Sequence, residues 1–271
     1  MSGGRAVLAI GAASVASASI AACSLLVDTD DLSTGRADAS ASEAGGPTEA
    51  GTSDASEAGS DAGADAAVSD PCAAAGVVFC SRFDEPTSLD ELTVTTDPET
   101  RVEHDTTVFF SPPGSARFTI DPSTNNSADA TLKRFAGNSV AHAVFSGVLR
   151  FDRSEAVNAR LVAIAVGDES SFLIDRNGGN IVLRENGVGT LGTVPVPSDG
   201  TWFRVELDLD GAATPPQITL KVGTAAPVTG RASAGSWAPG RVFVEFGVSE
   251  TNTPASKGWL VHWDDVSIRK L

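Results

Sequence analysis

The 271-residue chain is poor in several residue types, and each shortage narrows what the protein could do. It contains no Tyr, one Met and three Cys, and its 19 basic against 35 acidic side chains give a formal net charge of −16. An acidic surface repels phosphate backbones, so the composition argues against nucleic-acid binding. Beyond the N-terminus the chain also lacks a long apolar run, which excludes a protein with several membrane spans.

The acidic charge is concentrated in residues 24–70, where 11 acidic side chains stand against Arg36 as the single base. This part of the chain is mostly Ala, Ser, Gly, Asp, Glu and Thr, and from Arg36 to Asp70 it has no aromatic residue. Such a composition cannot bury enough apolar surface to offset the entropy lost on ordering. We therefore predict that residues 23–70 form a disordered acidic tether.

The N-terminus has the layout of an export signal. Arg5 precedes a small-residue apolar stretch from Ala6 to Ala22, and this stretch is too rich in Ala, Ser and Gly to favour a transmembrane anchor. Ile20, Ala21, Ala22 and Cys23 resemble the lipobox of bacterial lipoproteins. The resemblance implies that residues 1–22 are a signal peptide and that Cys23 is lipidated. An ordinary cleavage site at residues 16–18 is the alternative, and it would leave Cys23 as a free thiol.

The number of cysteines favours lipidation, because three is an odd number for an exported protein. If Cys23 carries lipid, Cys72 and Cys80 remain as a pair that could form a disulfide in an oxidising compartment or stay as two buried thiols. Two or more acyl chains make membrane attachment stable. In lipoproteins the residue after the lipidated Cys helps to choose the membrane, and Ser24 favours the outer one.

Residues 71–271 have the alternating pattern of half-buried strands. Short runs of Val, Leu, Ile and Phe alternate with polar residues and are separated by turn signals such as Asn177-Gly178-Gly179 and Asn186-Gly187. The strands predicted from this pattern are 77–83, 116–120, 130–135, 145–152, 161–166, 171–175, 181–184, 202–209, 217–222, 242–248 and 259–268. A short helix is suggested only at 88–92. Many short strands without intervening helices predict an all-β antiparallel sandwich.

The domain resembles the concanavalin A-like lectin and glucanase superfamily, especially its laminin G-like jelly rolls. The resemblance is carried by the early residues Phe79, Cys80, Phe83 and Asp84, the hairpin 172–184, the strand 201–211 with its partner 218–222, and the closing strand 259–269. It implies a jelly-roll fold more firmly than any activity, because one fold hosts many functions.

Three carboxylates on one predicted strand raise the possibility of hydrolysis. Glu206, Asp208 and Asp210 stand at alternate positions, so they share one face of the strand. Laminarinase-like members of the superfamily place a nucleophile, a supporting Asp and an acid/base in this way, but with Glu at the third position. A solvated strand face is the competing interpretation.

A noncatalytic binding face is the favoured interpretation. Trp202 shares a strand face with Arg204, Glu206 and Asp208, so an aromatic plane lies beside charged hydrogen-bonding groups, as a sugar ring requires. Neighbouring strands could add further side chains to this face, namely His142, Arg150, Asp152, Phe243 and Glu245.

The last predicted strand changes the parity of its apolar residues. Trp259, Val261 and Trp263 share one face, and Val266 and Ile268 the other, so a bulge at Asp264 and Asp265 would restore a single buried face. The resemblance to lectins adds that Ca²⁺ could bind near the first and last strands. Its oxygen ligands would be Asp84 or Glu85 together with Asp264 or Asp265, and a bulge held by local hydrogen bonds is the alternative.

Together these features predict a lipid-anchored protein of the cell envelope, most simply of the outer membrane. Its lectin-like domain would act as a noncatalytic binding module for a polysaccharide or an envelope glycan. A glucanase-like hydrolase and a protein-binding adhesion or assembly module are the alternatives.

Overall fold

The computed structural model describes residues 70–122, 127–155, 158–167, 170–233, 240–251 and 256–271. The predicted signal peptide, the lipidation site at Cys23 and nearly all of the predicted tether lie outside these residues and stay predictions. In the part of the chain that is described, no helix is long and apolar enough to cross a membrane.

The described residues form fifteen β-strands and two short 3-10 helices, with no α-helix among them. The 3-10 helices are η1 (Pro71–Ala73) and η2 (Pro86–Leu89), and η2 overlaps only the first two residues of the short helix suggested at 88–92. The strands are β1 (Val77–Ser81), β2 (Thr93–Thr96), β3 (Thr100–Asp105), β4 (Ser115–Ile120), β5 (Ser127–Val140), β6 (His142–Arg153), β7 (Ala159–Val166), β8 (Ser170–Asn177), β9 (Asn180–Glu185), β10 (Gly189–Pro195), β11 (Phe203–Asp210), β12 (Gln217–Val222), β13 (Val228–Arg231), β14 (Gly240–Thr251) and β15 (Trp259–Lys270).

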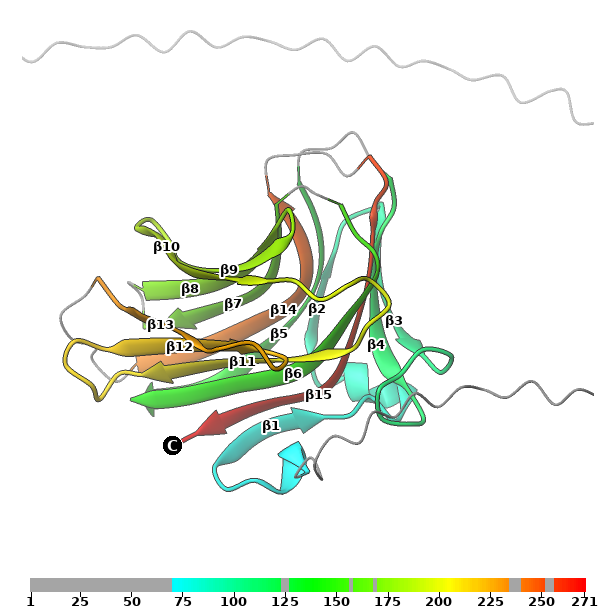
Figure 1. The fold of residues 1–271 in the computed structure, drawn as a ribbon. Helices are drawn as coiled ribbons and strands as arrows, with labels where there is room; N and C mark the ends of the chain where they lie inside the picture. The colour runs from blue at the N-terminus through cyan, green and yellow to red at the C-terminus, as the bar shows by residue number, and fades with distance from the viewer. Residues whose placement is uncertain (1–69, 123–126, 156–157, 168–169, 234–239, 252–255) are drawn as a thin grey trace, which may run out of the picture. The chain divides into compact units, whose positions relative to one another are not determined.

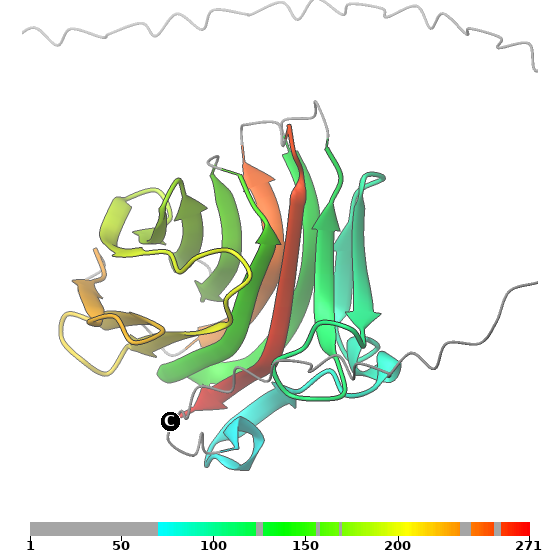
Figure 2. The same cartoon turned by 45° about the vertical axis from the view of Figure 1, so that its right-hand side comes forward.

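The strands build two antiparallel sheets that pack face to face (Figures 1 and 2). Sheet A has the order β13-β12-β11-β6-β15-β4-β3, with β1 added on β15, and sheet B has the order β10-β9-β8-β7-β14-β5-β2. Strands distant in sequence therefore lie side by side, as β15 does between β6 and β4 in Figure 2. The predicted fold class, an antiparallel β-sandwich of jelly-roll type, is confirmed.

The core lies between the two sheets and is rich in large aromatic side chains. Alternation along each strand places one set of residues inward, and on β11 this set is Phe203, Val205, Leu207 and Leu209. The largest fully buried side chains include Trp259, Trp263, Phe118, Phe145, Phe151, Phe172 and Phe246. The sequence pattern alone predicted most of this inward set.

The bulge predicted in the last strand is present. The pairing of β15 with β6 shifts between Asp264 and Ser267, and Asp265 has a φ of 47°. Trp263 before the bulge and Val266 and Ile268 after it are consequently all buried on the core side. The bulge therefore lets the apolar residues before and after it face the same side of the sheet.

Two glycines allow the edge strands β10 and β13 to approach each other from the two sheets. A Cβ atom at Gly192 would collide with Val228, and a Cβ atom at Gly230 would lie 2.8 Å from the side chain of Leu191. Only hydrogen fits at these two positions. The sandwich is thereby closed at this edge by direct contact between strands.

The Cys72–Cys80 disulfide, which was one of two alternatives from the sequence, is formed, with a Cα–Cα distance of 5.4 Å. It joins η1 to β1 at the point where the described residues begin. The start of the domain is thus fastened to the strand that pairs with β15.

Candidate functional site

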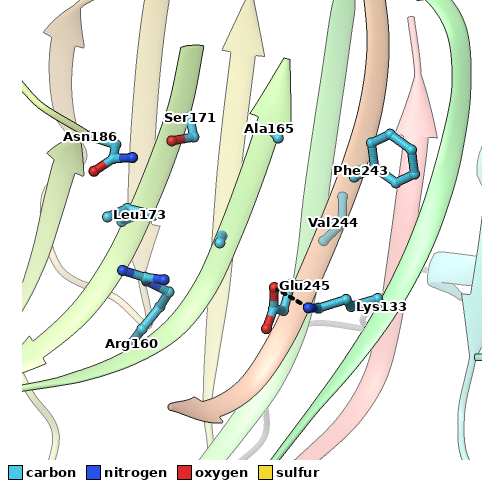
Figure 3. Close-up of a pocket in the computed structure, with 10 residues that line it drawn as sticks. Lys133, Arg160, Ala165, Ser171, Leu173, Asn186, Phe243, Val244 and Glu245 are labelled. Atoms are coloured by element: carbon cyan, nitrogen blue, oxygen red, sulfur yellow. Dashed lines mark ion pairs between the residues drawn. The ribbon is translucent and has the colours of Figure 1, made fainter. Parts of the chain in front are cut away.

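A shallow hollow lies on the outer face of sheet B, and small side chains on its central strands create it (Figure 3). Cross-strand pairing lines up Phe243, Ala165 and Ser171 in one row and Glu245, Ala163 and Leu173 in the next. Because the side chains of Ala163, Ala165 and Ser171 are short, the surface over them is lower than over Phe243, Glu245 and Leu173. The resulting space has a volume of ≈ 350 Å³.

Charged and polar groups line the flanks of this hollow. Lys133 of β5 pairs with Glu245 of β14 at 3.3 Å, and the hydroxyl of Thr131 donates to the same carboxylate at 2.8 Å. Arg160 of β7 and Asn186, which follows β9, line the hollow with them (Figure 3). Among these polar groups, Glu245 alone was predicted from the sequence as a binding residue.

An exposed aromatic pair continues the hollow along β14. The rings of Phe135 and Phe243 lie 5.1 Å apart, and both side chains are about 40% exposed. The guanidinium of Arg241 lies over Phe243 at 5.1 Å. An exposed pair of large apolar rings beside hydrogen-bonding groups is well suited to contact the C–H face of a sugar.

The outer face of sheet A gathers most of the binding residues predicted from the sequence. Arg204, Glu206 and Asp208 point outward from β11, and Arg150 and His142 lie on the adjacent β6. Each of them is engaged with a neighbour on the same face. The contacts are Arg204 to Ser146 at 3.0 Å, Glu206 to Lys221 at 2.6 Å, Asp208 to His142 at 2.8 Å and Arg150 to Asp152 at 2.6 Å.

Trp202, the aromatic residue predicted for this face, covers a buried histidine. Its ring lies 6.4 Å from that of His262 and 6.1 Å from that of Phe110. His262 is 1% exposed and lies between the carboxylates of Asp105, at 3.1 Å, and Asp152, at 2.8 Å. Trp202 is therefore half-buried in an aromatic and ionic cluster.

The ionisation of this cluster follows from its surroundings. Burial lowers the pKa of His262, although the two carboxylates act in the opposite direction. Burial alone would raise the pKa of Asp105, but hydrogen bonds from the hydroxyl and amide of Thr107, together with His262, hold it well below its usual value. Asp105 is therefore a buried carboxylate that remains ionised.

Phe243 and Glu245, which were predicted to share a face with Trp202, lie instead on sheet B. Both belong to β14, whereas Trp202 directly precedes β11 of sheet A. The two outer faces are separated by the core. The predicted binding residues are thus divided between two surfaces. The alternation of residues within a strand shows which side chains share a face, but it does not show to which sheet the strand belongs.

The carboxylates considered for hydrolysis do share one face of β11, as predicted. Glu206 faces two cations, Lys221 at 2.6 Å and Arg269 at 3.9 Å. Asp210 accepts hydrogen bonds from the backbone amides of Ala212 and Ala213, in the turn that follows the strand. These contacts give the carboxylates structural partners, and the predicted hydrolytic role stays a prediction.

The two acids of the bulge hold a loop against sheet A. Asp264 accepts hydrogen bonds from the amides of Phe110 and Ser111 at 2.9 and 2.8 Å, and Asp265 accepts one from the Ser111 hydroxyl at 3.0 Å. Burial raises the pKa of Asp264 to about 7, against the effect of these amides. Within the described segments, no three His, Cys, Asp or Glu residues are grouped to hold a metal ion. Calcium binding by Asp84, Glu85, Asp264 and Asp265 stays a prediction.

Comparisons with known proteins identify the fold. No protein-family model matches the chain, and no curated protein matches its sequence significantly. Solved structures do match, at low identity. They include the cellulose induced protein Cip1 (16% identity, TM-score 0.57, 71% of this chain and 97% of that one) and an endo-β-1,4-glucuronan lyase from the fungus Trichoderma reesei (15%, 0.52, 72% and 96%). The alginate lyase vAL-1 from Chlorella virus is similar at 11% identity and a TM-score of 0.50, over 72% of this chain and 100% of that one.

Proposed function

We propose that the sandwich is a noncatalytic glycan-binding module and that the glycan occupies the hollow on the outer face of sheet B. The observation that carries this proposal is the combination of a floor of small side chains with an exposed aromatic flank at Phe243. A pyranose ring presents an apolar C–H face and a rim of hydroxyls. The aromatic ring would take the first, and Asn186, Ser171 and the charged groups would take the second.

The residues around the hollow favour binding over catalysis. The chain has no Tyr, and its three His belong to strands of sheet A, namely β3, β6 and β15. The carboxylate of Glu245 is committed to Lys133 and Thr131. The similarity to solved structures that are named as a glucuronan lyase and an alginate lyase supports a role with glycans, through the shared fold.

The same proposal includes the place of the protein in the cell envelope. Cys23 would carry the lipid, and the acidic tether would hold the domain away from the membrane, most simply the outer one. An adhesion or assembly role toward another protein is the alternative.

Substitution of Phe243 by Ala is expected to weaken glycan binding by about tenfold or more, because a Phe side chain that a sugar covers contributes on the order of 1.5 kcal/mol. Binding would be measured on a broad glycan array and then by calorimetry. Trp202→Ala on sheet A is the matched control, and we expect it to leave the affinity unchanged. If Trp202→Ala alone lost binding, the glycan site would lie on sheet A instead. If the original domain bound no glycan, the proposed function would be rejected.

Substitution of Cys23 by Ser is expected to release the full-length protein from membranes into the soluble fraction, because the acyl chains can no longer be attached. Fractionation of cells that produce either form measures this directly. Palmitate labelling of the original protein but not of Cys23→Ser would support lipidation, and equal membrane association of the two forms would reject it.

A further inference from the structure

The hollow on sheet B is surrounded by cations although the chain as a whole is acidic. Lys133 and Arg160 line it, Arg184 stands on β9 directly across from Leu173, and Arg241 lies over the neighbouring rings. The carboxylates among them are Glu245 and Asp175. The chain has a net charge of −16 and as a whole repels anions. A local group of four cations could attract an anion in spite of this general repulsion.

These cations differ in whether a carboxylate already neutralises them. Lys133 is paired with Glu245 at 3.3 Å, and Arg184 with Asp175 at 3.5 Å. Arg160 forms no ion pair with any described residue, and its buried Nε atom finds no hydrogen-bond partner among them. Burial raises the pKa of Asp175, and the charges of Arg160 and Arg184 act in the opposite direction, although only Arg184 lies within ion-pair distance.

A guanidinium at the side of a hollow, with no ion pair to the described residues, is a site for an anion. Arg can donate two parallel hydrogen bonds to a carboxylate or a sulfate, and partial burial strengthens the attraction. The rest of the hollow fits the ring of a sugar that carries such a group: Ala163 and Ala165 leave the floor low, and Phe243 lies on the side away from Arg160 (Figure 3).

We propose that the glycan bound in this hollow is an anionic polysaccharide, whose carboxylate or sulfate pairs with Arg160 while the sugar ring lies against Phe243. This inference rests on the proposed glycan-binding function and names its ligand class. The carboxylate and sulfate forms share the chemistry that Arg160 recognises, so the probes must distinguish them.

The test compares Arg160→Gln with the original domain by calorimetry. The probes are polygalacturonate and alginate, which carry carboxylates, dextran sulfate, which carries sulfates, and dextran, which is neutral. Loss of a charge-assisted pair is expected to weaken binding of the preferred anionic polymer on the order of 10- to 100-fold. Added salt should weaken binding of the original domain more than binding of Arg160→Gln. The melting temperatures of the two proteins should agree.

Arg231→Gln is the matched control, because it removes the same charge from the exposed edge strand β13 of sheet A. We expect it to bind the anionic polymer as the original domain does. Equal losses in Arg160→Gln and Arg231→Gln would mean nonspecific attraction and would overturn the proposal. Binding of dextran alone, or anionic binding that Arg160→Gln leaves intact, would overturn the anionic preference while the glycan-binding function stands. Binding to none of these polymers nor to any array glycan would reject both.

Discussion

Replacement of Trp263 by Ala is expected to lower the free energy of unfolding by about 3–5 kcal/mol. Trp263 is fully buried at the centre of β15. Its ring lies 5.8 Å from that of Phe145 and 5.9 Å from that of Phe246, so it joins side chains of sheets A and B. Its Nε1 also donates a hydrogen bond to the carbonyl of Gly247 at 3.3 Å. The substitution would leave a large cavity and remove this hydrogen bond as well.

Urea unfolding followed by circular dichroism measures this effect. Phe135→Ala is the matched control, because Phe135 is also aromatic and lies on a strand of sheet B but is 43% exposed. We expect that control to cost less than about 1 kcal/mol. Should Trp263→Ala unfold at nearly the same urea concentration as the original protein, the contact between sheets would not depend on this ring.

The strands that could be predicted from the sequence are those in which one face is apolar and the other polar. β11 alternates without exception, so its register and inward face follow directly from its residues. β3 was missed because its sequence, Thr100–Asp105, carries charges on one face and Thr, Val and His on the other. β10 was missed because two glycines interrupt its pattern, and Gly192 is required only by its contact with Val228 of the other sheet. Such a requirement appears only once the strands are assembled.

The hollow on sheet B was also hidden in the sequence. β7 alternates as expected, but its outward positions include Ala163 and Ala165, which the pattern treats as ordinary strand residues. A depression forms only because Ser171 on the adjacent strand is small as well and Phe243 on the other side is large. Small residues at alternating outward positions of one strand were the available signal. The neighbours that turn them into a hollow could not be predicted.

The ionic cluster around His262 shows the same dependence on assembly. The three histidines are far apart in sequence and lack metal-ligand spacing, so His262 carried no prediction. Its partners Asp105 and Asp152 come from β3 and β6, which only the order of sheet A brings to either side of β15. A cluster formed by three separate strands leaves no local motif.

Asp105→Asn is expected to lower the free energy of unfolding by about 2 kcal/mol at pH 7. The substitution removes a buried negative charge that forms ion pairs and hydrogen bonds with neighbouring groups. The Asp105 side chain contacts His262 at 3.1 Å and Arg117 at 3.4 Å, and it accepts a hydrogen bond from the amide of Thr107 at 2.8 Å. Because its pKa in the folded state lies below the usual 3.8, its stabilisation is complete above pH 4 and is lost as the pH falls further. Asn does not titrate, so the difference between the two proteins should shrink below about pH 4.

Urea unfolding at pH 7, 5 and 3.5 separates this charge effect from a packing effect, since Asn and Asp have nearly the same size. Asp121→Asn is the matched control, because Asp121 pairs with Arg101 at 2.7 Å but both side chains are exposed. Solvent screens such a pair, and its loss should cost less than about 1 kcal/mol at every pH. A difference for Asp105→Asn that is the same at all three pH values would mean that the amide disturbs packing. The buried carboxylate beside His262 would then not be the source of the stability.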